Sequence, residues 1–287
     1  MSHAGDRALV LGGGGATGNA WLLGVVAGLR EAGVDVTGAD LLVGTSAGAT
    51  AAAQLAGADP ADLLAAVLDA PPVPPRPARP VTDHLERTGR VIAAAADAAD
   101  MRRRIGAAAL AMEAASDDAA QARWRATVAA RLPSPQWPER PLLVTAVDAR
   151  TGEPAVLDRH SGVELVDAVA ASCAGGFAYR VGDRQLIDGG YRRNENADLA
   201  AGYGRVLVLS PLGGRTRHPL AWGLQLAAQV DELRAGGSAV ETVVPDNDAE
   251  ELFGANAMDV SLRPAAARAG RDQGRALAGR LAAFWHR

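Results

Sequence analysis

The sequence predicts an α/β fold: a three-layer α/β/α arrangement with a mostly parallel central sheet and a helical cap insert. Two short apolar segments near the start, residues 7–12 and 41–43, are each followed by a glycine-containing turn and a helical pattern. Such β-loop-α units are typical of a parallel sheet covered by helices. The chain has 287 residues, 48% of them hydrophobic, which suits one large domain over 1–287.

The opening elements follow one another closely. Residues 7–12 form the first expected strand, and the glycine-rich stretch Gly12–Gly18 connects it to a helix over Asn19–Ala32. Leu41–Val43 is the second expected strand, and an alanine-rich helix follows it to about Leu55. We therefore expect both glycine-containing turns at the carboxyl edge of one parallel sheet, where α/β proteins bind their ligands.

Two proline-rich breaks, at 71–80 and 133–141, bound the middle of the chain. The composition of the first predicts an extended, semi-rigid segment. Between the breaks, an Ala/Arg-rich region over roughly 82–131 has a helical pattern. We interpret 71–140 as a helical cap on the single domain. A plain helical layer against the sheet is an equally good interpretation.

The remaining elements complete the sheet and its helices. Expected strands lie at 142–147, 155–157, 179–181, 184–187, 205–209 and 240–244, and expected helices at 163–171, 220–235 and 265–285. Gly182 and Asp183 between two of these strands indicate a hairpin. The hairpin ends on Asp188-Gly189-Gly190, and the chain contains no internal repeat.

Bulk properties exclude several classes of function. The net charge of −4 lacks the positive excess of nucleic-acid-binding proteins. The single cysteine, Cys173, excludes an internal disulfide and a multi-cysteine metal site. The chain has no lysine, which excludes Ser–Lys dyads, Schiff-base lysines and P-loops. We expect no cofactor, metal or nucleic acid, and the sequence does not predict the oligomeric state.

The expected location is the cytoplasm. The segment Met1–Arg7 is short and polar, without the pattern of a secretory signal peptide. The fully apolar runs are far shorter than the roughly 18 residues that span a bilayer. We therefore expect a soluble protein, or one that contacts a membrane only peripherally.

The segment Gly44-Thr45-Ser46-Ala47-Gly48 matches the G-x-S-x-G nucleophile elbow between a strand and a helix. In such an elbow, strained backbone angles project the serine hydroxyl from the end of the sheet. The small residues Gly44 and Gly48 let the chain turn, and the following helix directs its N-terminal N–H groups at the site. A serine that only caps a helix is the alternative. In this context we expect Ser46 to be a nucleophile.

The segment Gly13–Gly18 has two interpretations. It matches the dinucleotide pattern G-x-G-x-x-G, which ends here on Gly18. The acidic partner of that pattern should follow the second strand, whereas Asp35 and Asp40 precede it. The other interpretation is an oxyanion hole, in which glycine lets backbone N–H groups converge on a negative oxygen. The candidate donors are the N–H groups of Gly13, Gly14, Gly15, Ala16 and Ala47.

A nucleophilic serine needs a base. The order Ser46, Asp188, His218 suits an α/β-hydrolase triad, but only one strand precedes the serine and His218 lies in a polar segment. His84 and His160 are expected to be solvated loop residues. Asp188, at the end of an apolar strand, is the better candidate, although Asp-Gly also signals an ordinary turn. Because its ordinary pKa lies about six units or more below that of serine, burial must raise it.

Together, Gly13–Gly18, Gly44–Gly48 and Asp188–Gly190 resemble the three motifs of the patatin-like phospholipase family. The resemblance covers about 7–56 and 141–211. It implies a three-layer fold and acyl-ester hydrolysis by a Ser46–Asp188 dyad, without a metal or cofactor, in a bacterial member of the family. Gly189 and Gly190 complete the last motif.

The resemblance extends around the last motif. Ala171–Ala174 and Phe177 resemble the Ala-Ser-x-Ala segment of the family and its following Phe, and Asn194 matches an Asn that often follows Asp-Gly-Gly. The sequence also departs from the family at three places. They are Thr17, where Arg or Lys is usual, and Gly175-Gly176 and Asn196, where prolines are common.

The leading hypothesis is a serine lipid acyl hydrolase of the phospholipase A, lysophospholipase or esterase type. The apolar cap residues expected to bind the acyl chain are Val91, Ile92, Ile105, Leu110 and Met112. The run Arg102–Arg104 could meet anionic lipid or simply form a solvated helix face. Alternatives are an acyltransferase that uses the same acyl-enzyme, a catalytically silent lipid-binding module and, as the weakest, a nucleotide-binding module.

Overall fold

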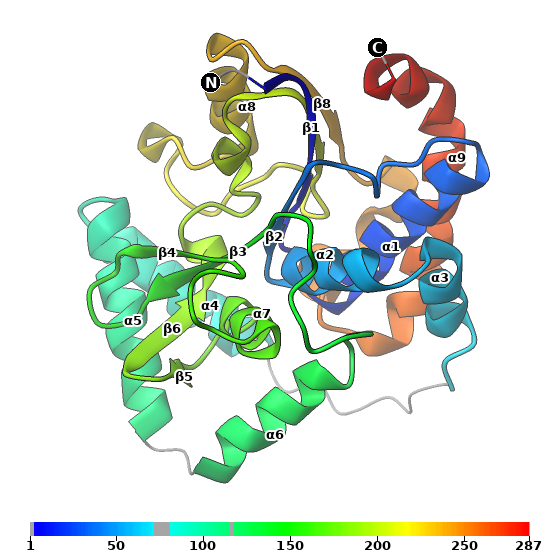
Figure 1. Cartoon of the computed structure of the whole chain (residues 1–287). Helices are drawn as coiled ribbons and strands as arrows, with labels where there is room; N and C mark the ends of the chain where they lie inside the picture. The colour runs from blue at the N-terminus through cyan, green and yellow to red at the C-terminus, as the bar shows by residue number, and fades with distance from the viewer. Residues whose placement is uncertain (1–2, 72–80, 115–117, 287) are drawn as a thin grey trace.

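The computed structural model describes residues 3–71, 81–114 and 118–286. The proline-rich stretch 72–80, expected to be extended, lies outside the described residues. A central sheet lies between two sets of helices (Figure 1). The chain thus has the expected three-layer α/β/α architecture.

The sheet has the strand order β5-β6-β3-β2-β1-β7-β8, and β4 pairs with β3 beside this path. The five strands β3, β2, β1, β7 and β8 are parallel, whereas β4 and β6 run antiparallel to β3. The prediction of a mostly parallel sheet is confirmed. The strands are β1 (His3–Leu11), β2 (Leu41–Thr45), β3 (Leu142–Asp148), β4 (Pro154–Leu157), β5 (Tyr179–Val181), β6 (Arg184–Asp188), β7 (Tyr203–Leu209) and β8 (Ala239–Val243).

Helices cover both faces of the sheet (Figure 1). The first face is covered mainly by α1 (Gly15–Glu31), α2 (Ala47–Gly57), α3 (Pro60–Leu68), α7 (Leu165–Ser172) and α9 (Arg263–Trp285). The second face is covered by α4 (Val81–Ala94), α5 (Ala98–Ala114) and α8 (Leu226–Ala235), while α6 (Asp118–Ala129) contacts α7. Short 3-10 helices are η1 (Gly189–Tyr191), η2 (Ala197–Ala200), η3 (Leu220–Trp222), η4 (Asn247–Leu252), η5 (Gly254–Asn256) and η6 (Val260–Leu262).

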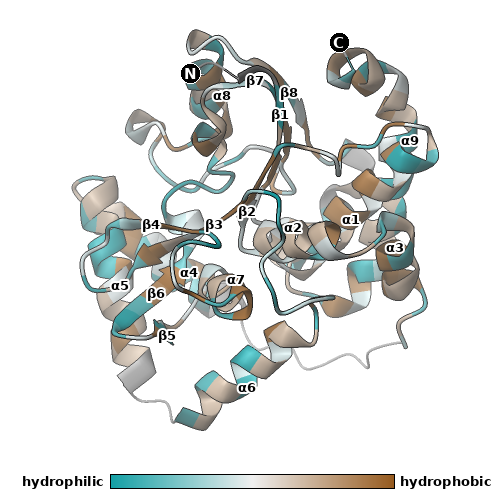
Figure 2. Cartoon of the chain, in the orientation of Figure 1, coloured by the Kyte–Doolittle hydropathy of each residue, from teal (hydrophilic) through white to brown (hydrophobic). Residues whose placement is uncertain are grey.

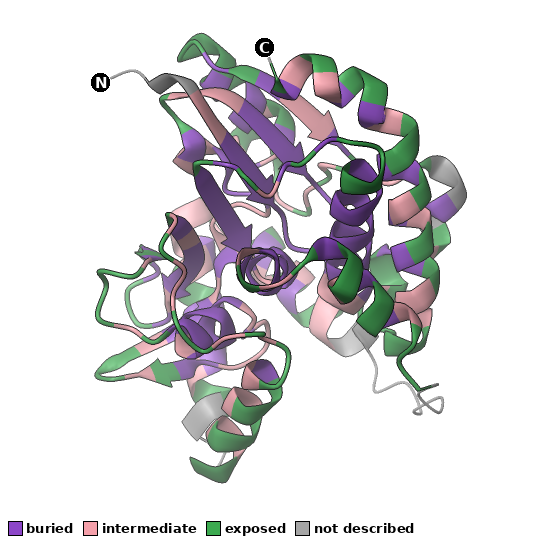
Figure 3. Ribbon diagram, turned by 45° about the vertical axis from the view of Figure 1, so that its right-hand side comes forward, coloured by how far each residue is buried: buried purple, intermediate pink, exposed green. Residues whose placement is uncertain are grey.

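The alternation of side chains along β1 explains the two covered faces. Leu9 and Leu11 belong to the large core on the α1 and α9 side, whereas Ala8 and Val10 contact the core under α8. Figure 2 shows the central strands as hydrophobic, and Figure 3 shows them and α1 as buried. Because both faces of β1 are buried, the strand carries no polar alternation, as expected for the centre of a parallel sheet.

The helices α1 and α9 approach each other closely through glycine. A Cβ on Gly28 would lie 2.1 Å from the carbonyl oxygen of Arg271, and one on Gly274 would lie 2.3 Å from that of Val25. At its outer edge the pair is joined by an ion pair between Arg271 and Glu31, at 2.9 Å. Any side chain at these glycines would force the two helix backbones apart.

Helices α4 and α5 pack directly on the second face of the sheet. Met101 and Ile105 of α5 lie in one apolar cluster with Val147 of β3 and Ile187 of β6. In Figure 1, α4, α5 and α6 gather at the β5–β6 end of the sheet, away from α1, α3 and α9. Helices α4 and α5, which belong to the region expected to form a cap, therefore also form a helical layer against the sheet.

Three element predictions differ from the structure. The helix expected from Asn19 begins at Gly15, so its first turn contains the end of the glycine loop. The helix expected over 220–235 is interrupted, because Gly223 has a φ of 66° and separates η3 from α8. Helix α3 was not expected, although Asp59 accepts a hydrogen bond from the N–H of Ala61 and so caps it.

Candidate active site

Ser46 lies at a sharp turn between β2 and α2. Its backbone angles, φ 54° and ψ −116°, are those of a nucleophile elbow. A non-glycine residue in such a conformation costs about 1–3 kcal/mol, which the surrounding contacts must offset. Gly48 allows this turn to pack on β1, since a Cβ there would lie 1.9 Å from the carbonyl oxygen of Leu11. The side chain of Ser46 thus projects from the carboxyl edge of the sheet.

Asp188 is the last residue of β6. Its Oδ1 accepts a hydrogen bond from the N–H of Gly190 at 2.8 Å. Burial raises the pKa of the carboxyl to about 6, although hydrogen bonding with the Ser46 hydroxyl and the N–H of Gly190 favours the charged form. Gly189 lets this turn press on β3, since a Cβ there would lie 2.2 Å from Oγ1 of Thr145. Ser46 and Asp188, 142 positions apart in the sequence, therefore meet at one site.

The glycine loop passes beside the serine. A Cβ on Gly13 would lie 3.6 Å from the Cβ of Ser46 and 2.7 Å from Oδ1 of Asn194. The N–H of Gly13 donates to the carbonyl oxygen of Asn194 at 3.1 Å, and Nδ2 of Asn194 donates to that of Gly13 at 3.2 Å. The N–H of Gly13 is therefore already bound within the protein.

The next N–H groups of the loop differ in their partners. Thr17 donates its N–H to the carbonyl oxygen of Ala257 at 3.1 Å, so the segment after η5 occupies one donor at the start of α1. The structure gives no partner within the described residues to the N–H groups of Gly14, Gly15 and Ala16. Free N–H groups in the first turn of a helix attract negative oxygens.

The side chain of Asn196 contacts both the segment that carries Ser46 and the turn that follows Asp188. The residue is fully buried, and its φ of 54° lies in the left-handed region, which asparagine tolerates better than most residues. Its Nδ2 lies 3.0 Å from Oγ1 of Thr45, 3.1 Å from Oγ1 of Thr145 and 3.3 Å from the carbonyl oxygen of Gly189. Thr45 precedes Ser46 and Gly189 follows Asp188. A proline, whose φ stays near −65°, cannot adopt this backbone conformation.

Two residues at the end of α7 also contact the backbone of Ser46. Oγ of Ser172 accepts a hydrogen bond from the N–H of Ser46, and Sγ of Cys173 donates to its carbonyl oxygen. Reasoning from single motifs missed the roles of Ser172, Cys173 and Asn196. The segment Ala171–Ala174 stood out only through its family resemblance.

A narrow pocket opens beside Gly175, between α4, α5 and the end of β6. Its lining is mostly apolar and comprises His84, Arg87, Thr88, Val91, Ile105, Ala108, Ala109, Met112, Ala174, Gly175, Gly176, Ile187 and Tyr191. Three of the apolar cap residues expected at an acyl site, Val91, Ile105 and Met112, are among them. The expectation that His84 is a solvated loop residue is wrong: it lies on α4, is half-buried and faces Gly176.

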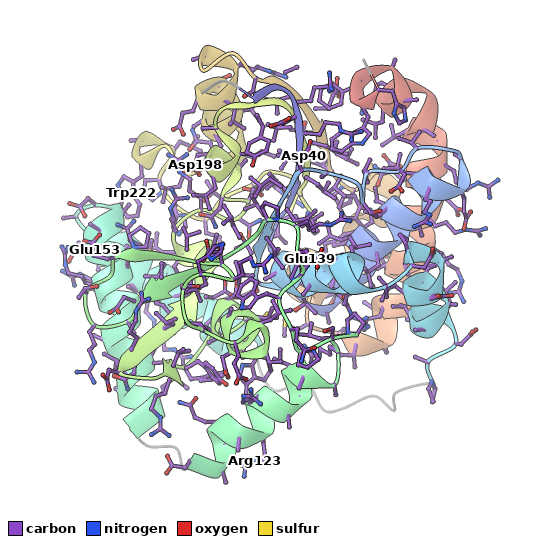
Figure 4. All side chains as sticks on the ribbon, in the orientation of Figure 1. Asp40, Arg123, Glu139, Glu153, Asp198 and Trp222 are labelled. Atoms are coloured by element: carbon purple, nitrogen blue, oxygen red, sulfur yellow. The ribbon has the colours of Figure 1, made fainter. Side chains whose placement is uncertain are left out.

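Other candidates lie outside this arrangement. His218 hydrogen-bonds to Thr216 and stacks on Trp222 (labelled in Figure 4), with ring centroids 6.1 Å apart. In the run Arg102–Arg104, the first residue donates to the carbonyl oxygen of Gly152 and the other two pair with Asp100. The described residues contain no group of three His, Cys, Asp or Glu side chains placed to hold a metal ion. No helix in this part of the chain is long and apolar enough to cross a membrane.

Comparison with known proteins gives two findings. The family model for patatin-like phospholipase matches residues 9–201, which include the glycine loop, the elbow and the Asp188 turn. Among solved structures, VipD from Legionella pneumophila has a TM-score of 0.45 at 14% identity, over 97% of this chain and 68% of VipD. The type III effector protein ExoU has a TM-score of 0.35 at 18% identity, over 96% of this chain and 54% of ExoU. No curated protein sequence matches the chain.

Proposed function

Because the chain belongs to the patatin-like phospholipase family, we propose that it hydrolyses acyl esters of lipids, with Ser46 as nucleophile and Asp188 as base. One observation carries this proposal. The hydroxyl of Ser46, a residue with strained backbone angles, hydrogen-bonds with the carboxyl of Asp188, whose pKa burial raises to about 6. A carboxylate with a pKa near the working pH is a stronger base than an ordinary aspartate. It still remains ionised at neutral pH.

The proposed reaction has two steps. Ser46 Oγ attacks the ester carbonyl carbon while Asp188 accepts the hydroxyl proton, and the tetrahedral intermediate then expels the alcohol, which takes that proton. In the second step a water molecule loses a proton to Asp188 and attacks the acyl-enzyme. The fatty acid leaves as the proton returns to Ser46 Oγ. The net reaction consumes one water for each ester bond.

The negative oxygen of each intermediate needs fixed donors. We assign this role to the N–H groups of Gly14, Gly15 and Ala16, together with that of Ala47 at the start of α2. The N–H of Gly13 is omitted, since it donates to Asn194. Removing one donor from an oxyanion hole typically lowers kcat by about 10²–10³-fold, so this loop would carry a large part of the catalysis.

The proposed acyl site is the pocket between α4 and α5. Ile105, Val91 and Met112 offer it apolar surface, and Gly175 and Tyr191 connect it to the Asp188 turn. On this proposal, α4 and α5 act as the cap of the single domain, even though α5 also packs on the sheet. Burial of an alkyl chain contributes about 0.8 kcal/mol per methylene. Chain length should therefore change the apparent affinity.

Labelling with a fluorophosphonate probe tests the proposal directly. The probe should label the wild-type protein, should label D188N more slowly than the wild type, and should not label S46A. S46A should also lose hydrolysis of a short p-nitrophenyl ester. A matched control is S238A, because Ser238 is buried but bonds to the carbonyl of Tyr203, at the opposite edge of the sheet. Full activity of S46A would overturn the mechanism. Failure to label the wild-type protein would favour a silent binding module.

Substrate assays separate the remaining functions. A panel of phospholipids, lysophospholipids, triglycerides and simple esters identifies which acyl esters are hydrolysed. Addition of an alcohol or thiol acceptor tests for transfer of the acyl group from Ser46 to an acceptor other than water. Products that consist mainly of the transferred ester would replace the hydrolase proposal with an acyltransferase.

A further inference from the structure

We propose that the turn Ser172–Gly175 is a positioning element that holds the nucleophile and the base in register. Each residue of this turn binds a part of the site through a backbone or side-chain atom. The inference rests on the proposed roles of Ser46 and Asp188, and it assigns residues that touch neither the substrate nor the reacting atoms.

The first half of the turn holds Ser46. Its N–H donates to Oγ of Ser172 at 2.8 Å, and its carbonyl oxygen accepts from Sγ of Cys173 at 3.2 Å. Both polar backbone groups of the strained residue are thus bound by consecutive side chains at the end of α7. Ser172 is fully buried, so no water replaces its hydroxyl when it is removed.

Cys173 can serve as a steady donor. Burial and, to a smaller extent, the negative charge of Asp188 raise the pKa of its thiol to about 12. The group therefore remains a thiol at any pH at which the enzyme would work, and it keeps its proton for the carbonyl of Ser46. Thr50, in the first turn of α2, places its Oγ1 3.5 Å from the same sulfur and so helps to fix the position of the thiol.

The second half of the turn holds the base. The N–H of Asp188 donates to the carbonyl oxygen of Ala174 at 3.1 Å. The hydroxyl of Tyr191, three residues after the base, donates to the carbonyl oxygen of Gly175 at 2.5 Å. A displacement of this turn would therefore move Ser46 and Asp188 relative to each other, because each is bonded to a different residue of it.

The strand order of the sheet explains why such a positioning element is needed. Ser46 follows β2 and Asp188 ends β6, and β3 lies between these two strands. The dyad residues are therefore not neighbours in the hydrogen-bond ladder, so pairing between strands alone does not set their separation. The turn Ser172–Gly175 connects them, since Ser172 and Cys173 bond to Ser46 and Ala174 bonds to Asp188.

The test compares S172A, C173A and C173S with the wild-type protein. S172A and C173A should lower kcat by about 10- to 100-fold with little change in KM, since a misplacement of about 1 Å can have an effect of this size. C173S keeps a donor and should retain most of the activity. The rate of fluorophosphonate labelling should fall in parallel with kcat.

A second readout distinguishes positioning from loss of stability. Hydrogen bonding with Ser46 lowers the pKa of Asp188, so a displaced hydroxyl should move the midpoint of the pH–rate profile upward in S172A. S238A, with its 2.7 Å hydrogen bond at the far edge of the sheet, should show neither change at a temperature where all variants are folded. If S172A does not fold, C173A gives the same comparison.

The outcomes separate this inference from the proposed function. If S46A is inactive while S172A and C173A have a kcat within twofold of the wild-type value, the positioning role is refuted and the dyad stands. The positioning role is also refuted if S238A loses as much activity as S172A. If S46A remains active, the proposed function itself fails.

Discussion

Replacing Asp188 by asparagine should make the protein inactive and, above pH 6, more stable. The substitution removes a carboxylate that burial holds in an unfavourable environment and keeps an oxygen to accept the N–H of Gly190. The sign follows from the raised pKa. The folded state binds its proton more tightly than the unfolded state, so the associated stability is complete below pH 3.8 and is lost as the pH rises through about 6.

The size of the effect can be worked out from the same values. A pKa raised from 3.8 to about 6 lowers the free energy of unfolding of the wild-type protein by about 3 kcal/mol between a pH well below 3.8 and pH 8. About 1 kcal/mol of this free energy is already lost at pH 4.5. D188N should therefore gain about 2 kcal/mol more, relative to wild type, at pH 8 than at pH 4.5. For a domain of this size, that difference of about 2 kcal/mol corresponds to roughly 3 °C in Tm.

Urea unfolding of both proteins at several pH values measures the difference, and D198N supplies a control of opposite sign. Burial acts to raise the pKa of Asp198, but the hydrogen bond and charge of Arg192 and the charge of Arg193 lower it overall. D198N should therefore lose stability, and evenly from pH 4.5 to 8, because Asp198 is ionised throughout in both states. A gain in D188N that does not grow with pH, or a loss at pH 8, would refute this reasoning.

Three further predictions concern catalysis, packing and chain length. Because the proposed base, Asp188, must be ionised to accept a proton, kcat/KM should fall tenfold per pH unit below about pH 6 and level off above it, which initial rates across pH can check. G274A should destabilise the α1–α9 contact by about 2 kcal/mol in urea unfolding, whereas G279A in the same helix meets no atom within 4 Å and should be neutral or stabilising. A108F should fill the pocket and reduce kcat/KM for long acyl chains about tenfold relative to acetyl esters, while A107F, on the exposed side of α5, should not. Equal behaviour of the two members of either pair would contradict the packing argument.

Much of the fold was predictable because its signals are local. Apolar runs such as Leu41–Val43 and turn residues such as Gly182 mark their elements within a few positions. The elbow geometry at Ser46 was also predictable, since a strand, a G-x-S-x-G pattern and a helix occur in sequence. The single helix expected over 220–235 was wrong in its first part, because Gly223, at φ 66°, separates η3 from α8.

The polar contacts around the dyad could not be predicted in this way. Ser172 lies 126 residues from Ser46, and no periodicity indicates that its hydroxyl accepts a backbone N–H from so far away. Asn196 occupies a left-handed backbone position that becomes visible only once Thr45 and Gly189 lie around it. Such residues depend on the assembled sheet, whereas Ser46 and the glycine loop carry patterns of their own.

The glycine contact between α1 and α9 has a consequence for synthesis. Glu31 and Arg271 lie 240 residues apart in the chain, so α1 is made long before the helix that covers it. Until α9 leaves the ribosome, the surface of α1 around Gly28 lacks the helix that covers it. A nascent chain with an exposed apolar helix is prone to aggregate and is a target for chaperones. The proposed hydrolase activity should therefore be detectable only after residues 263–285 are released, although Ser46 and Asp188 are made earlier.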